Sequence, residues 1–151
     1  MMLHIIKLPP LHFIMCLAGM YLTGKHLPSR AITSQDLSTI TWVALTLIGI
    51  FIMGLSAYKF RQHRTNIEAF REPNNLITTG IFSLTRNPIY IGFLIILIGS
   101  VFYINQYSGF VFVGIFFVLA DRWYIPHEER DAHRIFGDAF TRYKARVRRW
   151  L

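Results

Sequence analysis

The chain has one cysteine and few charged residues. Cys16 alone can form neither an intrachain disulfide framework nor a cysteine-based metal site. Charged residues make up 16% of the chain, whereas an average soluble domain carries about a quarter. Hydrophobic residues make up 53% and occur in long apolar runs. This balance argues against a large soluble core and favours a membrane protein.

Several common types of functional site are also missing. The sequence contains no glycine-rich phosphate-binding loop of the P-loop or Rossmann type, and no Ser-His-Asp arrangement can be singled out. His127 and His133 are six residues apart, so they do not share a helix face and do not suggest a metal pair. The sequence therefore predicts no bound metal.

The net charge is +8, from 16 lysines and arginines against 8 acidic residues. A basic balance can indicate a nucleic-acid partner, but here the basic residues lie between the apolar runs. This distribution is typical of the positive-inside rule for membrane proteins. We therefore expect no nucleic-acid partner and an integral membrane location, most simply a bacterial inner membrane.

Four apolar segments are expected to be membrane-spanning helices: residues 8–22, 39–60, 89–104 and about 110–125. The second is close to the ~20 residues that a bilayer requires, and a polar turn at 105–109 joins the third and fourth into a hairpin. The first, with Lys7 before it, resembles a signal peptide, but no small-x-small cleavage site follows, which favours a retained span. The predicted fold class is all-α, in a single membrane domain over residues 1–151.

The basic residues also predict which side of the membrane each segment faces. Thirteen of the sixteen lie at the C-terminal ends of the second and fourth spans or in the segments that follow them. With four spans these two segments lie on one side, which the positive-inside rule makes cytoplasmic. Both termini are therefore predicted to be cytoplasmic. The thirteen are Lys59, Arg61, Arg64, Arg71 and Arg86, then Arg122, Arg130, Arg134, Arg142, Lys144, Arg146, Arg148 and Arg149.

The C-terminal tail has the pattern of an amphipathic helix. Pro126 is expected to end the fourth span or to begin the next helix. Gly137 lowers helix stability by about 1 kcal/mol relative to alanine, so we expect a break near it. Such a helix can lie in the lipid headgroup layer or pack over the cytoplasmic ends of the spans, and the pattern leaves both open. Its apolar face would consist of Phe136, Phe140, Tyr143, Val147 and Trp150.

Three groups of residues are candidates for chemistry, and each also has a purely structural explanation. In the first group, Arg86, Asn87 and Pro88 precede an apolar run. Asn87 is a favoured N-cap, Pro88 is a favoured first helical residue, and Arg86 can extend to a lipid phosphate. Alternatively, Arg86 and the positive end of the helix form a site for a carboxylate or phosphate.

The second group is the acidic pair Glu128 and Glu129. Acids in the first turn complement the helix dipole, but this pair can also accept hydrogen bonds from hydroxyl groups or face a cation. The third is Arg146, which either binds lipid phosphates or clamps a carboxylate. Asp121, near the membrane boundary, is a weaker candidate, and pairing with Arg122 or another basic residue is the simpler explanation for it.

The order of these groups is more specific than any one of them. The segment LITTGIFSLTRNPIYIG, residues 76–92, resembles the motif Leu-Val-Thr-x-Gly-Pro-Tyr-x-x-x-Arg-(His/Asn)-Pro-x-Tyr-x-Gly of the isoprenylcysteine carboxyl methyltransferase family, which is grouped with the membrane phospholipid methyltransferases. A helical hairpin follows. The segment EERDAHRIFGDAFTRYKARV, residues 128–147, then resembles the family's second pattern, Glu-Glu-Arg-x-Leu-x-x-x-Phe-Gly-x-x-Tyr-x-x-Tyr-x-x-Arg-Val. The resemblance covers about residues 65–151.

This chain departs from the family patterns at a few positions. Ile81 and Phe82 stand where the family has proline and tyrosine, and Ala132 and Phe140 stand where it has leucine and tyrosine. Asn87 replaces the histidine of the prenylcysteine enzymes and is similar to the bacterial branch. None of these changes removes a carboxylate or an arginine of the patterns.

The resemblance implies an integral-membrane methyltransferase that uses S-adenosylmethionine and a lipophilic acceptor from the bilayer. The acceptor group is a carboxylate, as in the prenylcysteine enzymes, or an amine or thiol, and the oligomeric state is not predicted. By position, the cofactor pocket is formed by Gly80, Arg86, Asn87, Pro88, Tyr90, Glu128 and Glu129, and the catalytic residues are Glu129 and, beside the acceptor group, Arg146.

Two other functions stay open at this point. One is a non-catalytic membrane scaffold or lipid-binding protein of the same fold. The other is a membrane reductase, because sterol reductases share part of this architecture, although their nicotinamide cofactor needs more spans than 151 residues offer.

Overall fold

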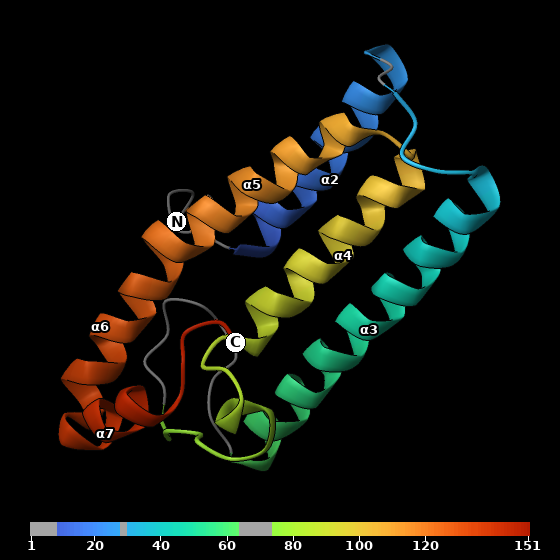
Figure 1. Ribbon diagram of the computed structural model, residues 1–151. Helices are drawn as coiled ribbons and strands as arrows, with labels where there is room; N and C mark the ends of the chain where they lie inside the picture. The colour runs from blue at the N-terminus through green and yellow to red at the C-terminus, as the bar shows by residue number, and fades with distance from the viewer. Residues whose placement is uncertain (1–8, 28–29, 64–73) are drawn as a thin grey trace.

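The computed structural model describes residues 9–27, 30–63 and 74–151 (Figure 1). Their regular structure is helical, apart from an isolated β-bridge between Ala31 and Gln106, which confirms the all-α prediction for these residues. Lys7 and Leu8, Arg64 and Arg71 of the orientation prediction, and residues 65–73 of the family resemblance lie outside the described residues. The helices are α2 (Pro9–His26), α3 (Gln35–Gln62), α4 (Pro88–Ile104), α5 (Phe110–Leu119), α6 (Ile125–Phe136) and α7 (Asp138–Arg146).

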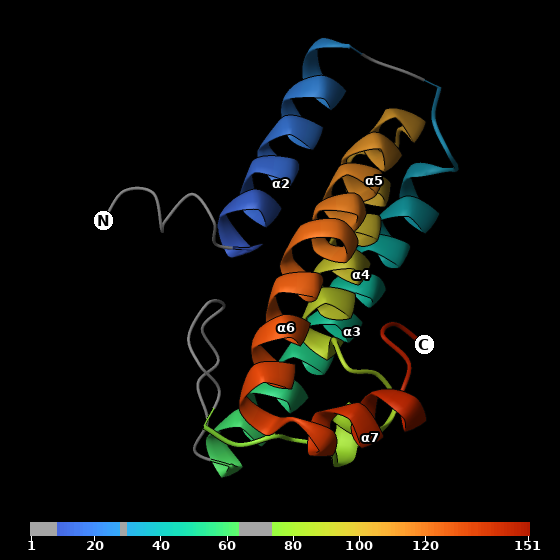
Figure 2. The same cartoon turned by 90° about the vertical axis from the view of Figure 1, so that its left-hand side faces the viewer.

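The long helices lie side by side (Figures 1 and 2). Two helical stretches in the described part are long and apolar enough to cross a membrane: Gln35–Gln62, of 28 residues, and Tyr107–Phe136, of 30 residues. The apolar helix Pro88–Ile104 is shorter, and α2 forms over 18 residues where the first span is expected. Helices able to cross a membrane therefore occur at the second and fourth expected spans, and the four-span arrangement stays a prediction.

α5 and α6 form one continuous helical stretch. A π-helical segment, Ala120–Tyr124, joins them, and the two helices follow one line in Figures 1 and 2. Pro126 therefore does not end the helix, and it lies in the first turn of α6, which agrees with the alternative that it begins the next helix. Proline has no N–H to donate, and its ring crowds the carbonyl group of the preceding turn. A wider π turn directly before Pro126 leaves room for that ring, so the helix continues without a break.

The tail folds back on the bundle instead of forming one amphipathic helix. Gly137 has a φ of 51° and separates α6 from α7, which confirms the expected break. α7 ends at Arg146, and Val147 is extended, with φ −120° and ψ 130°. The prediction of a single apolar helix face over residues 136–150 is therefore wrong. Beyond α7, the chain runs beside the start of α4 (Figure 1).

The main buried core lies between α2, α4 and α5. Leu97 and Val101 of α4 and Phe116 of α5 are fully buried there. The Tyr124 hydroxyl lies 2.7 Å from Nδ1 of His12, which links the π-helical segment to α2. This core fixes α4 relative to the helix that continues into α6, and so it positions the residues that follow.

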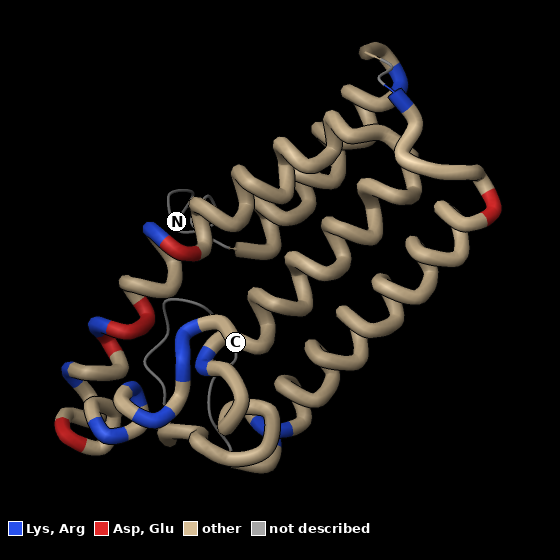
Figure 3. Tube along the Cα trace, in the orientation of Figure 1, with Lys and Arg blue, Asp and Glu red and all other residues tan. Residues whose placement is uncertain are grey.

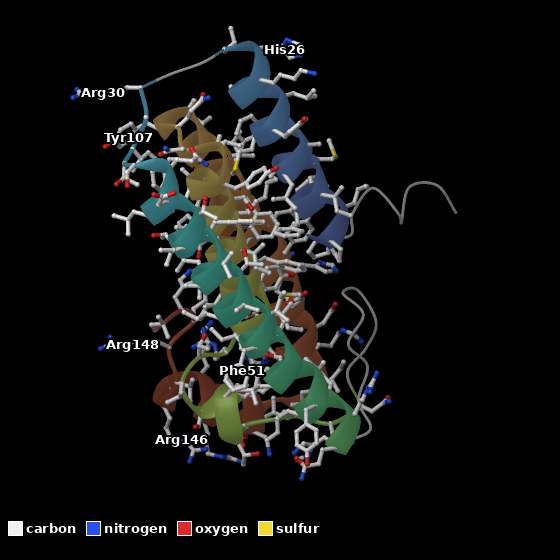
Figure 4. All side chains as sticks on the ribbon, turned by 90° about the vertical axis from the view of Figure 1, so that its right-hand side faces the viewer. His26, Arg30, Phe51, Tyr107, Arg146 and Arg148 are labelled. Carbon is white, nitrogen blue, oxygen red and sulfur yellow. The ribbon has the colours of Figure 1, made fainter. Side chains whose placement is uncertain are left out.

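Charged residues are concentrated at one end of the bundle. In Figure 3 they cluster around α6, α7 and the C-terminal residues. α4 contains no charged residue, and the charges of α3 lie near its two ends. His26 and Arg30 lie at the opposite end of the bundle from Arg146 and Arg148 (Figure 4). An apolar middle between charged ends is what a membrane environment requires.

α3 and α4 approach each other closely at a pair of glycines. A Cβ atom added to Gly49 would lie 2.8 Å from the carbonyl oxygen of Gly92, and one added to Gly92 would lie 3.0 Å from the carbonyl oxygen of Gly49. Both contacts are with backbone, which can give way only if the two helices separate. Small residues at such crossings permit the close backbone packing that is typical of membrane helix pairs.

We expect Gly92→Ala to lower the free energy of unfolding by about 1–3 kcal/mol, the usual effect of inserting a methyl group into a closely packed contact. Gly114→Ala is the matched control, because a Cβ atom added at Gly114 meets no described atom within 4 Å. Denaturant unfolding of the protein in detergent measures both variants. Equal stabilities for the two variants would contradict the close approach of α3 and α4.

Candidate functional site

The candidate site lies where the start of α4 meets α6 and the C-terminal residues. Arg86 and Asn87 immediately precede α4, and Pro88 is its first residue. Glu128 and Glu129 lie in the first half of α6. Arg86 and Glu129 are in direct contact, although they are 43 positions apart in the sequence. The structure therefore brings together two of the three groups that the sequence singles out.

Glu129 is the centre of a partly buried cluster of charges. Its Oε1 accepts a hydrogen bond of 2.6 Å from Nη2 of Arg86, and the two side chains are 12% and 8% exposed, respectively. Arg149 donates to both carboxylate oxygens, from Nε to Oε1 at 3.2 Å and from Nη2 to Oε2 at 2.9 Å. Nζ of Lys144 lies 3.5 Å from Oε2. Two-pronged binding by an arginine fixes the carboxylate in orientation as well as in position.

Arg86 is also held by the backbone of the tail. Its Nη1 donates to the carbonyl oxygens of Val147 and, at 3.4 Å, Lys144. Its backbone N–H donates to the carbonyl oxygen of Arg148 at 3.1 Å. Nε of Arg86 is buried, and no described residue accepts a hydrogen bond from it. An unpaired buried donor costs free energy, so an acceptor group bound beside this N–H would stabilise the site.

Asn87 ties the start of α4 to the tail. It occupies the N-cap position, as expected, but makes no side-chain capping hydrogen bond. Its Nδ2 instead donates to the carbonyl oxygen of Arg149 at 2.9 Å, and the Thr85 hydroxyl donates to the same oxygen at 3.1 Å. N-capping therefore explains why Asn87 stands at the start of α4, but it does not explain the hydrogen bond of its side chain to the tail.

Glu128 has a tyrosine as its partner. The Tyr90 hydroxyl, from α4, donates to Oε1 of Glu128 at 2.8 Å. Within the described residues, Glu128 forms no ion pair. The ring of Tyr90 is buried and stacks near that of Tyr124, with 6.2 Å between the ring centroids. The two neighbouring glutamates therefore differ: the charge of Glu129 is balanced by arginines, and that of Glu128 has no cation beside it.

Tyr143 of α7 connects the tail to the segment before α4. Its hydroxyl donates to the carbonyl oxygen of Phe82 at 2.6 Å. Burial raises the pKa of Tyr143 to about 12, so the hydroxyl stays protonated at neutral pH and can keep this hydrogen bond. Phe82 belongs to the 3₁₀ turn Gly80–Ser83. The hydrogen bond therefore holds α7 against this turn.

A cavity of about 960 Å³ lies beside these contacts, and its lining includes Asn87, Tyr90 and Tyr143. Its charged lining residues within the described part are Arg86, Glu128, Glu129 and Asp131. The apolar part of the lining follows α3, from Ile50 to Phe60, and the first half of α4 toward the middle of the bundle. The cavity therefore combines a charged region with a long apolar wall. Its remaining apolar lining includes Pro9 and Pro10 at the start of α2, and Phe140 of α7.

Two residues predicted for the site do not line this cavity. Gly80 has a φ of 63°, which favours glycine, and begins the 3₁₀ turn. Arg146 is exposed, donates from Nε to the carbonyl oxygen of Arg142 at 3.3 Å, and extends away from the helices in Figure 4. The predicted residues that do line it are Arg86, Asn87, Pro88, Tyr90, Glu128 and Glu129.

From the sequence alone, Arg149 is only one of the basic residues that follow the fourth span. Besides Glu129, its guanidinium contacts Asp121, with 3.1 Å between Nη1 and Oδ1. Asp121 also lies 3.6 Å from Nε of Arg122, which agrees with the simpler explanation for that aspartate. No sequence pattern marks Arg149, because it follows the last helix and lies 20 and 28 positions from its two acidic partners.

Comparison with known proteins gives one family and two relatives. Residues 37–139 match the family model of the phospholipid methyltransferases. Over 78 residues the chain is 36% identical to protein-S-isoprenylcysteine O-methyltransferase B of Arabidopsis thaliana, a match that covers 50% of this chain and 39% of the plant protein. Over 62 residues it is 34% identical to an uncharacterized protein of Haemophilus influenzae, a match that covers 41% of this chain and 98% of that protein. No solved structure matches the chain.

Proposed function

This chain belongs to the phospholipid methyltransferase family of membrane methyltransferases, and on that basis we propose that it transfers a methyl group from S-adenosylmethionine to a lipophilic acceptor in the membrane. The family and the plant relative support methyl transfer to a lipophilic substrate. The observation that carries the proposal for this chain is the cavity, because it joins a charged region to a long apolar wall.

The charges that line the cavity support a cationic methyl donor. S-adenosylmethionine carries a sulfonium and an ammonium group beside one carboxylate. Glu128, Glu129 and Asp131 supply three carboxylates against the single guanidinium of Arg86. Arg86 and Arg149 pair with Glu129, and Arg134 lies 3.3 Å from Asp131. The Glu128 carboxylate is left to face the positive charge of the donor.

Arg86 and two aromatic rings fit the remaining parts of the cofactor. Nε of Arg86 is buried with no acceptor among the described residues, and a cofactor carboxylate would supply that acceptor. Phe82 and Tyr90 line the same cavity and offer flat faces for an adenine or a sulfonium. The residues that would hold the cofactor are therefore Arg86 for its carboxylate, Glu128 for its cation or ribose, and these rings for the rest.

When bound, the cofactor supplies an electrophilic methyl group on a positively charged sulfur. The contribution of the chain is to position the two reactants and to exclude water. The buried side chains of Pro88, Phe93 and Tyr143 line the same cavity. Ile50 and Met53 of α3 extend the apolar lining, where the hydrocarbon part of the acceptor would lie. The proposal leaves the acceptor group as a carboxylate, an amine or a thiol.

We place the cavity's charged region and both termini on the cytoplasmic side of a single, four-span membrane domain. The concentration of basic residues around α6 and α7 supports this orientation (Figure 3). The side-by-side packing of α2, α3, α4 and α5 supports the four spans. Arg146 lies outside the cavity, and the proposal gives it no part in binding.

A labelling experiment tests the proposed function. Membranes that contain the protein are incubated with S-adenosylmethionine labelled in its methyl group, and label is counted in the lipid and protein fractions. We expect Arg86→Ala to lower the transferred label at least about tenfold, because a charge-assisted hydrogen bond contributes about 1.5–3 kcal/mol. Arg148→Ala, at an exposed neighbouring arginine, should transfer label like the unaltered protein. Absence of label in every fraction, together with no cofactor binding by calorimetry, would refute the proposal.

A non-catalytic membrane scaffold of the same fold is the second candidate. The pairing of Arg86 with Glu129 and of Glu129 with Arg149 favours it, because such a cluster can also serve only to fasten the tail to α4 and α6. The replacements at Ala132 and Phe140 point the same way. Cofactor binding without transfer of label to any lipid extract would favour the scaffold.

A further inference from the structure

The residues after α7 form a strap across the start of α4. We use the name C-terminal strap for residues 147–150. The Val147 carbonyl oxygen accepts from Nη1 of Arg86, and the Arg148 carbonyl oxygen accepts from the Arg86 backbone N–H at 3.1 Å. The Arg149 carbonyl oxygen accepts from Thr85 and Asn87. Each residue from 85 to 87 is therefore hydrogen-bonded to the strap.

The side chain of Arg149 reaches the other half of the site. Its Nε and Nη2 donate to the two oxygens of Glu129, at 3.2 Å and 2.9 Å. Its Nη1 donates to Oδ1 of Asp121 at 3.1 Å and to the Asp121 carbonyl oxygen at 3.3 Å. Nε1 of Trp150 donates to the same Oδ1 at 3.1 Å. The strap is thus fastened to α6 and to the π-helical segment by side chains and to the start of α4 by its backbone.

We propose that Arg149 is a positioning residue for the cofactor site, acting through Glu129 and Asn87. Its guanidinium fixes the orientation of the Glu129 carboxylate, and its carbonyl oxygen fixes the orientation of the Asn87 side-chain amide. One residue therefore fixes the spacing between the start of α4 and α6, the two segments that carry the charged lining of the cavity. The inference rests on the proposed function for what the site binds.

The guanidinium geometry makes this role specific to arginine. The Arg149 guanidinium donates four hydrogen bonds, two to Glu129 and two to Asp121. A lysine ammonium is a single point charge and cannot span two carboxylates in this planar arrangement. Arg149→Lys is therefore expected to behave like Arg149→Ala and not like the unaltered protein. Arg148→Ala is the matched control, since the Arg148 side chain extends away from the helices (Figure 4) and only its backbone contacts the start of α4.

Two measurements test the role on full-length protein in detergent. The first is hydrogen–deuterium exchange over residues 84–88, where we expect Arg149→Ala to speed exchange by about tenfold or more, because local opening is governed by the contacts that hold a segment. The second is the dissociation constant of S-adenosylmethionine, which we expect to rise about tenfold in Arg149→Ala and Arg149→Lys. Arg148→Ala should change neither quantity.

A double variant separates positioning from general stability. In a Glu129→Gln background, Arg149→Ala should weaken cofactor binding by less than about threefold, because residues that act through one another are not additive. A tenfold effect that persists in that background overturns the inference. Unchanged exchange over residues 84–88 in Arg149→Ala also overturns it, whether or not the cofactor binds. If the unaltered protein binds no cofactor, the proposed function fails and the exchange measurement alone decides the role of Arg149.

Discussion

Glu129→Gln is expected to lower methyl transfer by about 100-fold or more, because it weakens the charge-assisted hydrogen bonds that hold Arg86 and Arg149 in the site, each of which contributes about 1.5–3 kcal/mol, and each 1.4 kcal/mol is a factor of ten. Glutamine keeps the shape of the side chain but carries no charge. It cannot balance Arg86 and Arg149, which donate to Glu129 at 2.6 Å and 2.9 Å. Transfer of labelled methyl groups and calorimetric cofactor binding measure the loss.

Asp138→Asn is the matched control for this variant. Asp138 lies in the first turn of α7 and is exposed, so its replacement removes the same charge near the same end of the bundle without touching the cavity. Melting temperatures without cofactor are recorded for both variants, and transfer is compared where both are folded. Equal transfer by Glu129→Gln and Asp138→Asn would show that the charge of Glu129 has no part in the reaction.

The sequence correctly predicted where helices begin and break near the site, because these points depend on the backbone preferences of single residues. Asn87 and Pro88 mark the start of a helix through backbone preferences of single residues. Gly137 marks a break for the same kind of reason, since its φ of 51° is unfavourable for other residues. Local signals of this kind predict where an element begins or ends, and they do so correctly at Asn87, Pro88 and Gly137.

The contacts that make the site could not be predicted in the same way. Arg149 lies beyond the last helix, where no periodicity indicates a face, and it contacts residues 20 and 62 positions away. The side chain of Asn87 makes a tertiary hydrogen bond that N-cap statistics do not contain. Pro126 shows the converse case, because a π-helical segment keeps the helix continuous where the local rule predicts an end.

The family resemblance predicted some of the contacts between distant residues that local rules could not, but it did not predict every position correctly. It placed Arg86, Tyr90 and the two glutamates in one pocket, and these residues do line one cavity. It also placed Arg146 beside the acceptor group, and Arg146 does not line this cavity. In α7 the side chain of residue 146 is exposed, because the helix buries the face that carries Phe140 and Tyr143. Sequence order alone does not specify which face of a short helix packs inward.

Glu128→Gln is expected to weaken S-adenosylmethionine binding by about 10- to 100-fold, since a hydrogen bond or contact that involves a charged group contributes about 1.5–3 kcal/mol. The Glu128 carboxylate lines the cavity and has the Tyr90 hydroxyl, not a cation, as its partner in the described part of the chain. Its charge is therefore available to a cationic ligand, and glutamine removes that charge while it keeps the volume. Calorimetry on protein in detergent measures the change in affinity.

Tyr90→Phe tests whether the position of the Glu128 carboxylate matters, because it leaves the charge of Glu128 unchanged. This variant keeps the buried ring and removes only the hydroxyl that donates to Glu128 at 2.8 Å, so we expect a smaller loss of affinity, about tenfold or less. Asp131→Asn is a second comparison, because Asp131 also lines the cavity but lies 3.3 Å from Arg134. If Glu128→Gln and Asp131→Asn weaken binding equally, the cavity responds only to its total charge. If Glu128→Gln leaves binding unchanged, the cation of the cofactor lies elsewhere, and the assignment of Glu128 is wrong even if methyl transfer itself is confirmed.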